Sequence, residues 1–256
     1  MSLNYQYIII SANEERQNKT NELLNKVNTN KAKIYNLQAT IPSLDDEFIN
    51  CIKNIKSDYE IRVACCTKSH LRALEYALND NSPEFSIILE DDVTFIKDNF
   101  CQFIDDIINK MKNHNIYKQL NMIHIGYILN SSYYEFLEKE PLDYLNKDIP
   151  LKSYISFYAF GAQGYIVRKS AILNNKHIIQ TKNINDFYNI ARNIIKFDTN
   201  IISIDYIINR IFLTAVIYPP LIIERNEQSL IGHTNQNKYW EEYFNKFPEQ
   251  KEKYLL

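Results

Sequence analysis

The chain has 256 residues, with 29 Lys and Arg against 31 Asp and Glu, and 45% of its residues are hydrophobic. A globular chain of this length buries a core without needing disulfides or structural metals. The net charge of −2 argues against nucleic acid as a partner, because binding to phosphates needs a surplus of Lys and Arg.

Glycine, cysteine and hydropathy patterns narrow the class further. The chain has four glycines, and neither G-x-G-x-x-G nor G-x-x-x-x-G-K-[ST] occurs, which excludes a Rossmann dinucleotide enzyme and a P-loop NTPase of the usual pattern. The four cysteines include no C-x-x-C pair, which predicts reduced, mostly buried thiols and no zinc site. The sequence shows neither a signal peptide nor the ~18 apolar residues of a membrane-spanning helix, so we expect a cytoplasmic protein.

The first part of the chain alternates between strand and helix patterns. A β-branched run, Tyr5–Ser11, precedes a polar segment with apolar residues at helical spacing. A weaker strand pattern at 33–37 is followed by an amphipathic segment at 44–55 that has acids in its first turn, where the helix dipole favours them. This order predicts a β-α-β-α beginning.

The strongest patterns lie in the middle of the chain. Residues 67–78 place Leu and Ala at helical spacing and are followed by Asn, Asp and Pro, which predicts a helix and its end. Residues 85–89 (FSIIL) form a continuous apolar run, which is typical of a strand covered on both faces of a parallel sheet. We expect a helix at about 97–112 and a short strand at 121–126 to follow.

The rest of the chain mixes loops, strands and helices. Residues 131–150 are polar and aromatic, which favours a loop over an active-site mouth. The remaining expected elements are two strand-like runs within 154–167 broken by Gly161 and Gly164, a helix at 201–212, a strand at 215–218 and a helical tail at 236–256. We therefore predict an α/β fold in which residues 1–256 form one domain, with a mostly parallel central sheet flanked by helices.

Three consecutive acids, Glu90, Asp91 and Asp92, follow the strongest predicted strand. Ligands of open α/β sheets bind at the carboxyl ends of the strands, so these acids lie where a ligand is expected. Repulsion among neighbouring carboxylates is relieved by a hard divalent cation, and such a cation can hold a diphosphate. The alternative is that the acids only end the strand at the surface.

The segment around these acids resembles glycosyltransferase family 25, which includes bacterial lipooligosaccharide galactosyltransferases and the collagen galactosyltransferases. The resemblance is carried by a Ser-His-Leu helix segment, an apolar strand and a Glu-Asp-Asp form of the metal-binding Asp-x-Asp motif, here Ser69, His70, Leu71, Ile87, Ile88, Leu89, Glu90, Asp91 and Asp92. The family's opening strand and Arg-bearing turn, its Gly-Tyr segment, its later Asp and its closing strand more loosely resemble residues 7–16, 160–171, 204–205 and 220–231.

The resemblance implies a GT-A-like fold, a UDP-sugar donor, a divalent cation (Mn²⁺ or Mg²⁺) and inversion at the anomeric carbon. The expected reaction moves a hexose from the UDP-sugar to a hydroxyl of a glycan or protein acceptor. The resemblance assigns metal binding to Asp91, Asp92 and His233. It assigns contacts with the donor to Ser11, Asn13, Arg16, Ser69, His70, Glu90 and Asp91.

Several of these residues have a second interpretation. His70 can be a hydrogen-bonded core residue of a helix, and His233 a solvated loop residue. An inverting displacement needs a base for the acceptor hydroxyl, and Asp205 is our first choice, although an acid there also suits a helix N-terminus. Asp186 and Asp198 are the other candidates for the base. Four tyrosines near the predicted strand ends are candidates for stacking on uracil or sugar rings: Tyr127, Tyr154, Tyr158 and Tyr165.

Two other functions fit parts of the sequence. Haloacid-dehalogenase phosphatases also place acids at a strand end, but residues 90–94 (EDDVT) lack the nucleophilic Asp two positions before the second acid. The non-enzyme alternative is a catalytically inactive glycosyltransferase-like domain that binds a sugar or nucleotide. The donor sugar stays open at this stage, as do the oligomeric state and the acceptor, for which glycans, lipid-linked oligosaccharides and protein side chains all fit.

Overall fold

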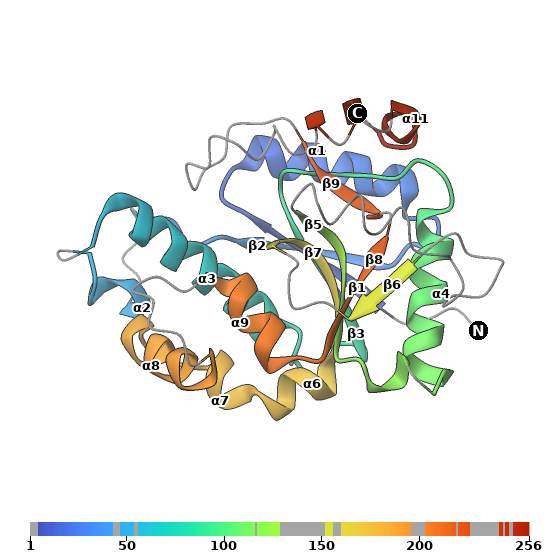
Figure 1. Cartoon of the computed structure of the whole chain (residues 1–256). Helices are drawn as coiled ribbons and strands as arrows, with labels where there is room; N and C mark the ends of the chain where they lie inside the picture. The colour runs from blue at the N-terminus through green and yellow to red at the C-terminus, as the bar shows by residue number, and fades with distance from the viewer. Residues whose placement is uncertain are drawn as a thin grey trace.

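The computed structural model describes residues 5–42, 47–53, 56–115, 117–128, 152–155, 160–195, 203–218, 220–225, 241–242, 244–245 and 248–255. The strands are β1 (Tyr5–Ser11), β2 (Lys33–Gln38), β3 (Phe85–Glu90), β4 (Val93–Phe95), β5 (Met122–Ile128), β6 (Lys152–Ile155), β7 (Phe160–Arg168), β8 (Thr214–Tyr218) and β9 (Ile222–Glu224). Seven of them form one sheet in the order β2-β1-β3-β7-β5-β8-β6, and β4 pairs with β9 in a second, two-stranded sheet (Figure 1).

The larger sheet is mostly parallel in the sense that five of its seven strands, all except β6 and β7, run in the same direction. β1 pairs in parallel with β2 and with β3, and β5 pairs in parallel with β8. β7 lies antiparallel between β3 and β5, and β6 is antiparallel to β8. The predicted fold class, an α/β fold with a mostly parallel central sheet flanked by helices, is confirmed.

Helices cover both faces of this sheet. They are α1 (Glu14–Val27), α2 (Glu47–Asn50), α3 (Asp58–Tyr76), α4 (Phe100–Asn113), the 3-10 helix η1 (Tyr117–Gln119), α6 (Lys169–Asn174), α7 (Lys176–Ile179), α8 (Ile184–Ile195), α9 (Ile204–Ile211) and α11 (Pro248–Lys251). α1 and α4 pack on one face, and α3, α8 and α9 pack on the other (Figure 1). In the ranges described above, no helix is both long and apolar enough to cross a bilayer.

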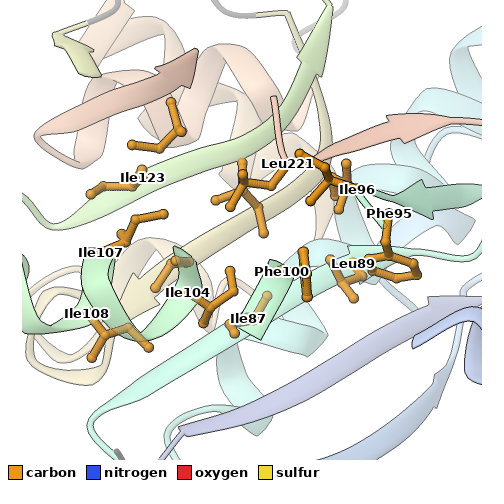
Figure 2. Close-up of a cluster of buried hydrophobic side chains, with 14 of the residues drawn as sticks. Ile87, Leu89, Phe95, Ile96, Phe100, Ile104, Ile107, Ile108, Ile123 and Leu221 are labelled. Atoms are coloured by element: carbon orange, nitrogen blue, oxygen red, sulfur yellow. The ribbon is translucent and has the colours of Figure 1, made fainter. Parts of the chain in front are cut away.

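The central strands bury side chains on both faces, which explains their continuous apolar sequence. In β3, Ile87 and Leu89 belong to the cluster under α1 and α4, whereas Ile88 belongs to the cluster under α3. Figure 2 shows the first cluster, where Ile104 and Ile107 of α4 pack with these β3 side chains. A strand covered on both sides cannot alternate between apolar and polar residues.

The two strand-like runs expected within 154–167 correspond to β6 and β7, but the glycines do not break the second one. Gly161 and Gly164 both lie inside β7. Gly164 is paired with Gly126 of β5, and Ile222 of β9 packs over both. A Cβ on Gly164 would lie 2.1 Å from Ile222 Cδ1, so the missing side chains let β9 approach the sheet.

Helix boundaries differ from the expectation in two places. The helix expected to begin at residue 67 begins at Asp58, because Ser57 and Glu60 form a capping box in which each side chain accepts a hydrogen bond from the other residue's backbone N–H. Of the helix expected over 44–55, α2 covers four residues, and 43–46 and 54–55 lie outside the described ranges.

The described part of the expected C-terminal tail packs against the small sheet. Tyr254 is buried, forms a β-bridge with Ile96 and donates a hydrogen bond from its hydroxyl to Pro220 O at 2.7 Å. The loop expected at 131–150 lies outside the described residues.

Candidate functional site

The carboxyl ends of β1 and β3 lie side by side. The consecutive acids Glu90 and Asp91 at the end of β3 point to different faces of the sheet. Ile10 is paired with Glu90, and Ile10 belongs to the cluster under α3. Because side chains alternate along a strand, Glu90 faces α3 and the next residues, Ser11 and Asp91, face α1. Glu90 and Asp91 therefore contact different groups instead of forming one cluster.

Asp91 is held by the segment that joins β1 to α1. Its Oδ2 accepts hydrogen bonds from the Ser11 hydroxyl at 2.6 Å and from Ala12 N at 3.2 Å. Its Oδ1 lies 3.9 Å from Nη1 of Arg16. Burial raises the pKa of the Asp91 carboxyl, although the Ser11 hydrogen bond and Arg16 act in the opposite direction.

Asn13 and Arg16 shape the start of α1 next to these acids. Asn13 is the N-cap of α1, and its side chain accepts a hydrogen bond from Arg16 N at 3.1 Å. The Arg16 guanidinium lies near two carboxylates, because its Nη1 is also 3.8 Å from Oδ2 of Asp92. The predicted residues Ser11, Asn13, Arg16, Asp91 and Asp92 are thus brought together at one corner.

Asp92 has a carboxylate oxygen that the described part of this corner leaves unsatisfied. Its Oδ1 is buried and has no hydrogen-bond partner among the described residues. Burial, reinforced by the charges of Glu90 and Asp91, raises the pKa of Asp92 to about 8, against the opposing effect of Arg16 and Arg225. A divalent cation would favour the charged form of this group, so its donor chemistry fits a metal ligand.

Three residues that the sequence analysis did not single out complete the corner. Arg225 is buried and donates from Nη2 to Asp91 O at 2.6 Å and from Nη1 to Val93 O and to the Thr20 hydroxyl, both at 2.8 Å. Thr20 in turn donates to Asp91 O at 2.6 Å. These bonds fix the backbone of the acidic segment between α1 and β9.

Glu224 is the third of these residues and adds a buried acid beside Asp91 and Asp92. It is paired with Val93 across β4 and β9, and its Oε2 has no hydrogen-bond partner in the part of the chain described. Burial and the charges of Asp92 and Glu90 raise the pKa of Glu224 to about 9. No local pattern marks Arg225, Thr20 or Glu224, because they reach the acids only through the packing of α1 and β9.

On the other face of the sheet, His70 of α3 joins Glu90 to the core. Its Nε2 lies 3.2 Å from Glu90 Oε1, and its Nδ1 lies 3.1 Å from the Tyr165 hydroxyl of β7. Cys66, one turn earlier on α3, offers a sulfur within 4.8 Å of ligand atoms of His70 and Glu90. Burial raises the pKa of the Cys66 thiol well above its ordinary value, and the neighbouring carboxylate of Glu90 adds to this.

Ser69 is a buried residue whose hydroxyl is fully used within the fold. It donates to Cys65 O at 2.7 Å and accepts from Thr40 N at 2.9 Å. These two bonds fasten the segment that follows β2 to α3.

Asp205, the predicted base, lies in the first turn of α9. Its Oδ2 accepts a hydrogen bond from Gly161 N at 2.9 Å, and its Oδ1 accepts from Tyr206 N at 3.1 Å and from the Ser203 hydroxyl. The carboxylate therefore ties α9 to the first residues of β7. Asp186, another candidate, lies in the first turn of α8 and accepts a hydrogen bond from the Asn183 side chain.

Two of the four tyrosines proposed to stack on a ligand cannot do so. Tyr127 and Tyr165 are fully buried in the core, and their hydroxyls contact Ile217 O and His70. That prediction is wrong for both, because neither ring has an exposed face. The side chains of Tyr154 and Tyr158, as well as His233 and Asp198, lie outside what the structure describes.

Solved structures with related folds share little sequence with this chain. A197 from STIV has 12% identity and a TM-score of 0.41, covering 88% of this chain and 95% of that chain. A glycosyltransferase involved in the glycosylation of the major capsid of PBCV-1 has 10% identity and a TM-score of 0.42, covering 88% and 94%. The galactosyltransferase LgtC, in complex with donor and acceptor sugar analogues, has 10% identity and a TM-score of 0.43, covering 94% of each chain.

A comparison of the sequence with family profiles shows the family to which the chain belongs. Among curated protein sequences, none matches this chain significantly. The sequence profile of glycosyltransferase family 25 (LPS biosynthesis protein), in contrast, matches residues 2–199, which include the Ser-His-Leu segment, the Glu-Asp-Asp motif and the β1–α1 corner. The chain therefore belongs to glycosyltransferase family 25.

Proposed function

We propose that the protein is a metal-dependent, inverting glycosyltransferase that moves a hexose from a UDP-sugar to a hydroxyl of a glycan or protein acceptor. Membership of family 25 supports glycosyl transfer as the activity. The observation that carries the finer proposal is the buried Oδ1 of Asp92, after β3 and beside Arg16, because this carboxylate oxygen has no hydrogen-bond partner within the described residues.

Asp92 is the first candidate to hold Mn²⁺ or Mg²⁺, because a hard cation prefers carboxylate oxygens and would satisfy the unpartnered one. Asp91 adds negative charge behind it, and His233 is kept as the predicted C-terminal ligand. A bound divalent cation supplies charge neutralisation for the diphosphate leaving group. Glu224, whose Oε2 has no hydrogen-bond partner among the described residues, is a further candidate oxygen ligand from β9.

Arg16 and the start of α1 are proposed to contact the donor phosphates. The Arg16 guanidinium is a bidentate donor suited to phosphate oxygens. Its Nη1 lies 3.9 Å from Asp91 and 3.8 Å from Asp92, so the guanidinium is next to the acids proposed to hold the cation and its diphosphate. Asn13, as the N-cap, and Ser11, as the partner of Asp91, keep this corner in place.

On the α3 side, His70 and Glu90 are proposed to contact the donor through Glu90, whose side chain is 25% exposed, whereas that of His70 is 1% exposed. Ser69 is proposed to support α3 without contacting the donor itself, because both hydrogen bonds of its hydroxyl are made within the fold.

Asp205 is proposed as the base that takes the proton of the acceptor hydroxyl. A carboxylate is the usual base for such a displacement, and the three donors around Asp205 fix the orientation of its carboxylate. Asp205→Asn should then keep UDP binding and lose transfer. Transfer at the wild-type rate by a folded Asp205→Asn variant would remove Asp205 from this role.

Hydrolysis of UDP-sugars without an acceptor tests the proposed function. The purified protein is incubated with a panel of UDP-hexoses, with Mn²⁺ or with a chelator, and released UDP is measured. We expect UDP release from at least one donor with Mn²⁺ only, loss of this release in Asp92→Ala, and no change in the exposed control Asp80→Asn. Binding of UDP without any turnover would instead support the inactive, nucleotide-binding alternative.

A further inference from the structure

Cys66, His70 and Glu90 form a cluster of three different metal-binding groups on the α3 side of the sheet. Cys66 and His70 are four residues apart on α3 and therefore project from the same face of the helix. Glu90 ends β3 and faces α3 because of the strand alternation described above. One ligand atom from each residue lies within 4.8 Å of the others.

We propose that these three residues bind a Zn²⁺ ion. Zn²⁺ accepts the sulfur, nitrogen and oxygen donors that this cluster combines, at metal–ligand distances of about 2.0–2.3 Å. Tetrahedral ligands at such distances are about 3.4–3.8 Å apart, so side-chain movements of about 1 Å bring the cluster to a coordinating arrangement. Binding converts the Cys66 thiol to the thiolate that ligates metals, and its proton passes to solvent.

The surroundings of His70 suit a ligand histidine. Its ring is 1% exposed, and its Nδ1 lies 3.1 Å from the Tyr165 hydroxyl. When Nδ1 carries the proton and donates it to the Tyr165 oxygen, Nε2 presents its lone pair toward Glu90. An outer hydrogen bond of this kind fixes the orientation of a ligand imidazole. The 25% exposed carboxylate of Glu90 gives the ion a route from solvent.

This site shares His70 and Glu90 with the proposed donor contacts, but its ion lies on a different face of the sheet from the one proposed at Asp92. The Asp91 carboxylate faces α1 and contacts Ser11 and Arg16, whereas Cys66 and His70 lie on α3 behind Glu90. The two sites also differ in chemistry, since a thiolate and an imidazole select Zn²⁺ over Mn²⁺ or Mg²⁺. A bound ion would join α3 to the end of β3. The lack of C-x-x-C pairs predicts no zinc site, and the pattern in the sequence that points to this one is the C-x-x-x-H spacing of Cys66 and His70.

Metal titration in the absence of UDP-sugar tests this proposal on the whole chain. Co²⁺ is used as a spectroscopic substitute for Zn²⁺, because a cobalt–thiolate bond gives a near-ultraviolet charge-transfer band, and Zn²⁺ affinity is measured by competition with a chromophoric chelator. We expect one equivalent of Co²⁺ per chain to give the thiolate band, Zn²⁺ to abolish this band, and Cys66→Ser to lose it. The control Cys51→Ser, which removes an exposed thiol outside the cluster, should keep the band.

Two further variants make the assignment specific. His70→Gln should weaken Zn²⁺ binding at least ~100-fold, and Tyr165→Phe, which removes only the outer hydrogen bond, should weaken it ~10-fold. Asp92→Asn should leave Zn²⁺ affinity unchanged, so this test and the test of the proposed function can fail independently. Absence of a thiolate band in the wild type overturns the proposal, as does a band that persists in Cys66→Ser or a Zn²⁺ affinity that His70→Gln does not change.

Discussion

The hydroxyl of Ser11, the last residue of β1, donates a 2.6 Å hydrogen bond to Oδ2 of Asp91, the first residue after β3. This bond joins two parallel strands at their carboxyl ends and turns the Asp91 carboxylate toward α1. Asp91 is thereby used within the fold, whereas Asp92, like Glu224, has an oxygen with no hydrogen-bond partner among the described residues.

The Ser11–Asp91 bond should be measurable as an energetic coupling. Ser11→Ala removes a buried hydrogen bond to a carboxylate and should lower the free energy of unfolding by ~1.5–3 kcal/mol. In urea unfolding, the double variant with Asp91→Ala should lose less than the sum of the two single variants, because both remove the same bond. Additive losses would show that the bond contributes nothing to stability.

Asp92→Asn should stabilise the metal-free protein at neutral pH. The pKa of Asp92 is about 8 in the folded protein and 3.8 as the ordinary value. The folded state therefore holds a proton that the unfolded state releases, and the stability contributed by this group falls as the pH rises from about 4 to about 8. Asn carries no charge, so the variant should gain on the order of 4 kcal/mol at pH 7 and nothing near pH 3.5. Urea unfolding of the wild type and the variant with a chelator at both pH values checks this. A variant that is no more stable than the wild type at pH 7 would contradict it.

Gly164→Ala should destabilise the protein through one identified contact. The new Cβ would meet Ile222 Cδ1 at 2.1 Å and Leu89 Cδ2 at 3.0 Å, so β9 would have to shift. We expect a loss of ~1–3 kcal/mol in thermal or urea unfolding. Ile222→Val removes the Cδ1 atom and should recover part of this loss in the double variant. No recovery would place the strain elsewhere in β7.

His124 should make stability depend on pH on the acidic side. It is fully buried in β5, its Nε2 lies 2.8 Å from Asn209 Oδ1, and burial lowers its pKa from 6.5 to about 4. Between these values the unfolded state takes up a proton that the folded state does not, so stability falls as the pH falls from about 6.5 to about 4, by up to ~3 kcal/mol. His124→Gln keeps a donor for Asn209 and should flatten the unfolding free energy over this range. An unchanged slope in that variant would exclude His124 as the cause.

Much of the fold could be predicted from local patterns. β1 and β3 are apolar runs with clear ends, and both were predicted to within one residue. The start of α3 was misplaced although Ser57 and Glu60 carry a readable capping signal. The path of β7 through two glycines could not be predicted, because it depends on Ile222, which is distant in sequence and packs against them.

Only part of the candidate site could be predicted, because some of its residues stand in local motifs and others reach the site only through packing between distant segments. The acids, Arg16 and His70 stand in local motifs, so the sequence located them. The split of Glu90 and Asp91 between two faces follows from strand alternation and could have been predicted once β3 was assigned. Arg225 and Glu224 could not, since only the pairing of β4 with β9 brings them to the acids.

The most direct test of the central claim is the affinity for UDP, measured by isothermal titration calorimetry with Mn²⁺ and with a chelator, for the wild type and for Asp92→Asn. We predict at least tenfold tighter binding by the wild type with Mn²⁺ than without it, and no such difference in the folded variant. Equal affinity of the wild type under both conditions, or an Mn²⁺ effect that Asp92→Asn leaves intact, would contradict the assignment of this corner as the metal and donor site.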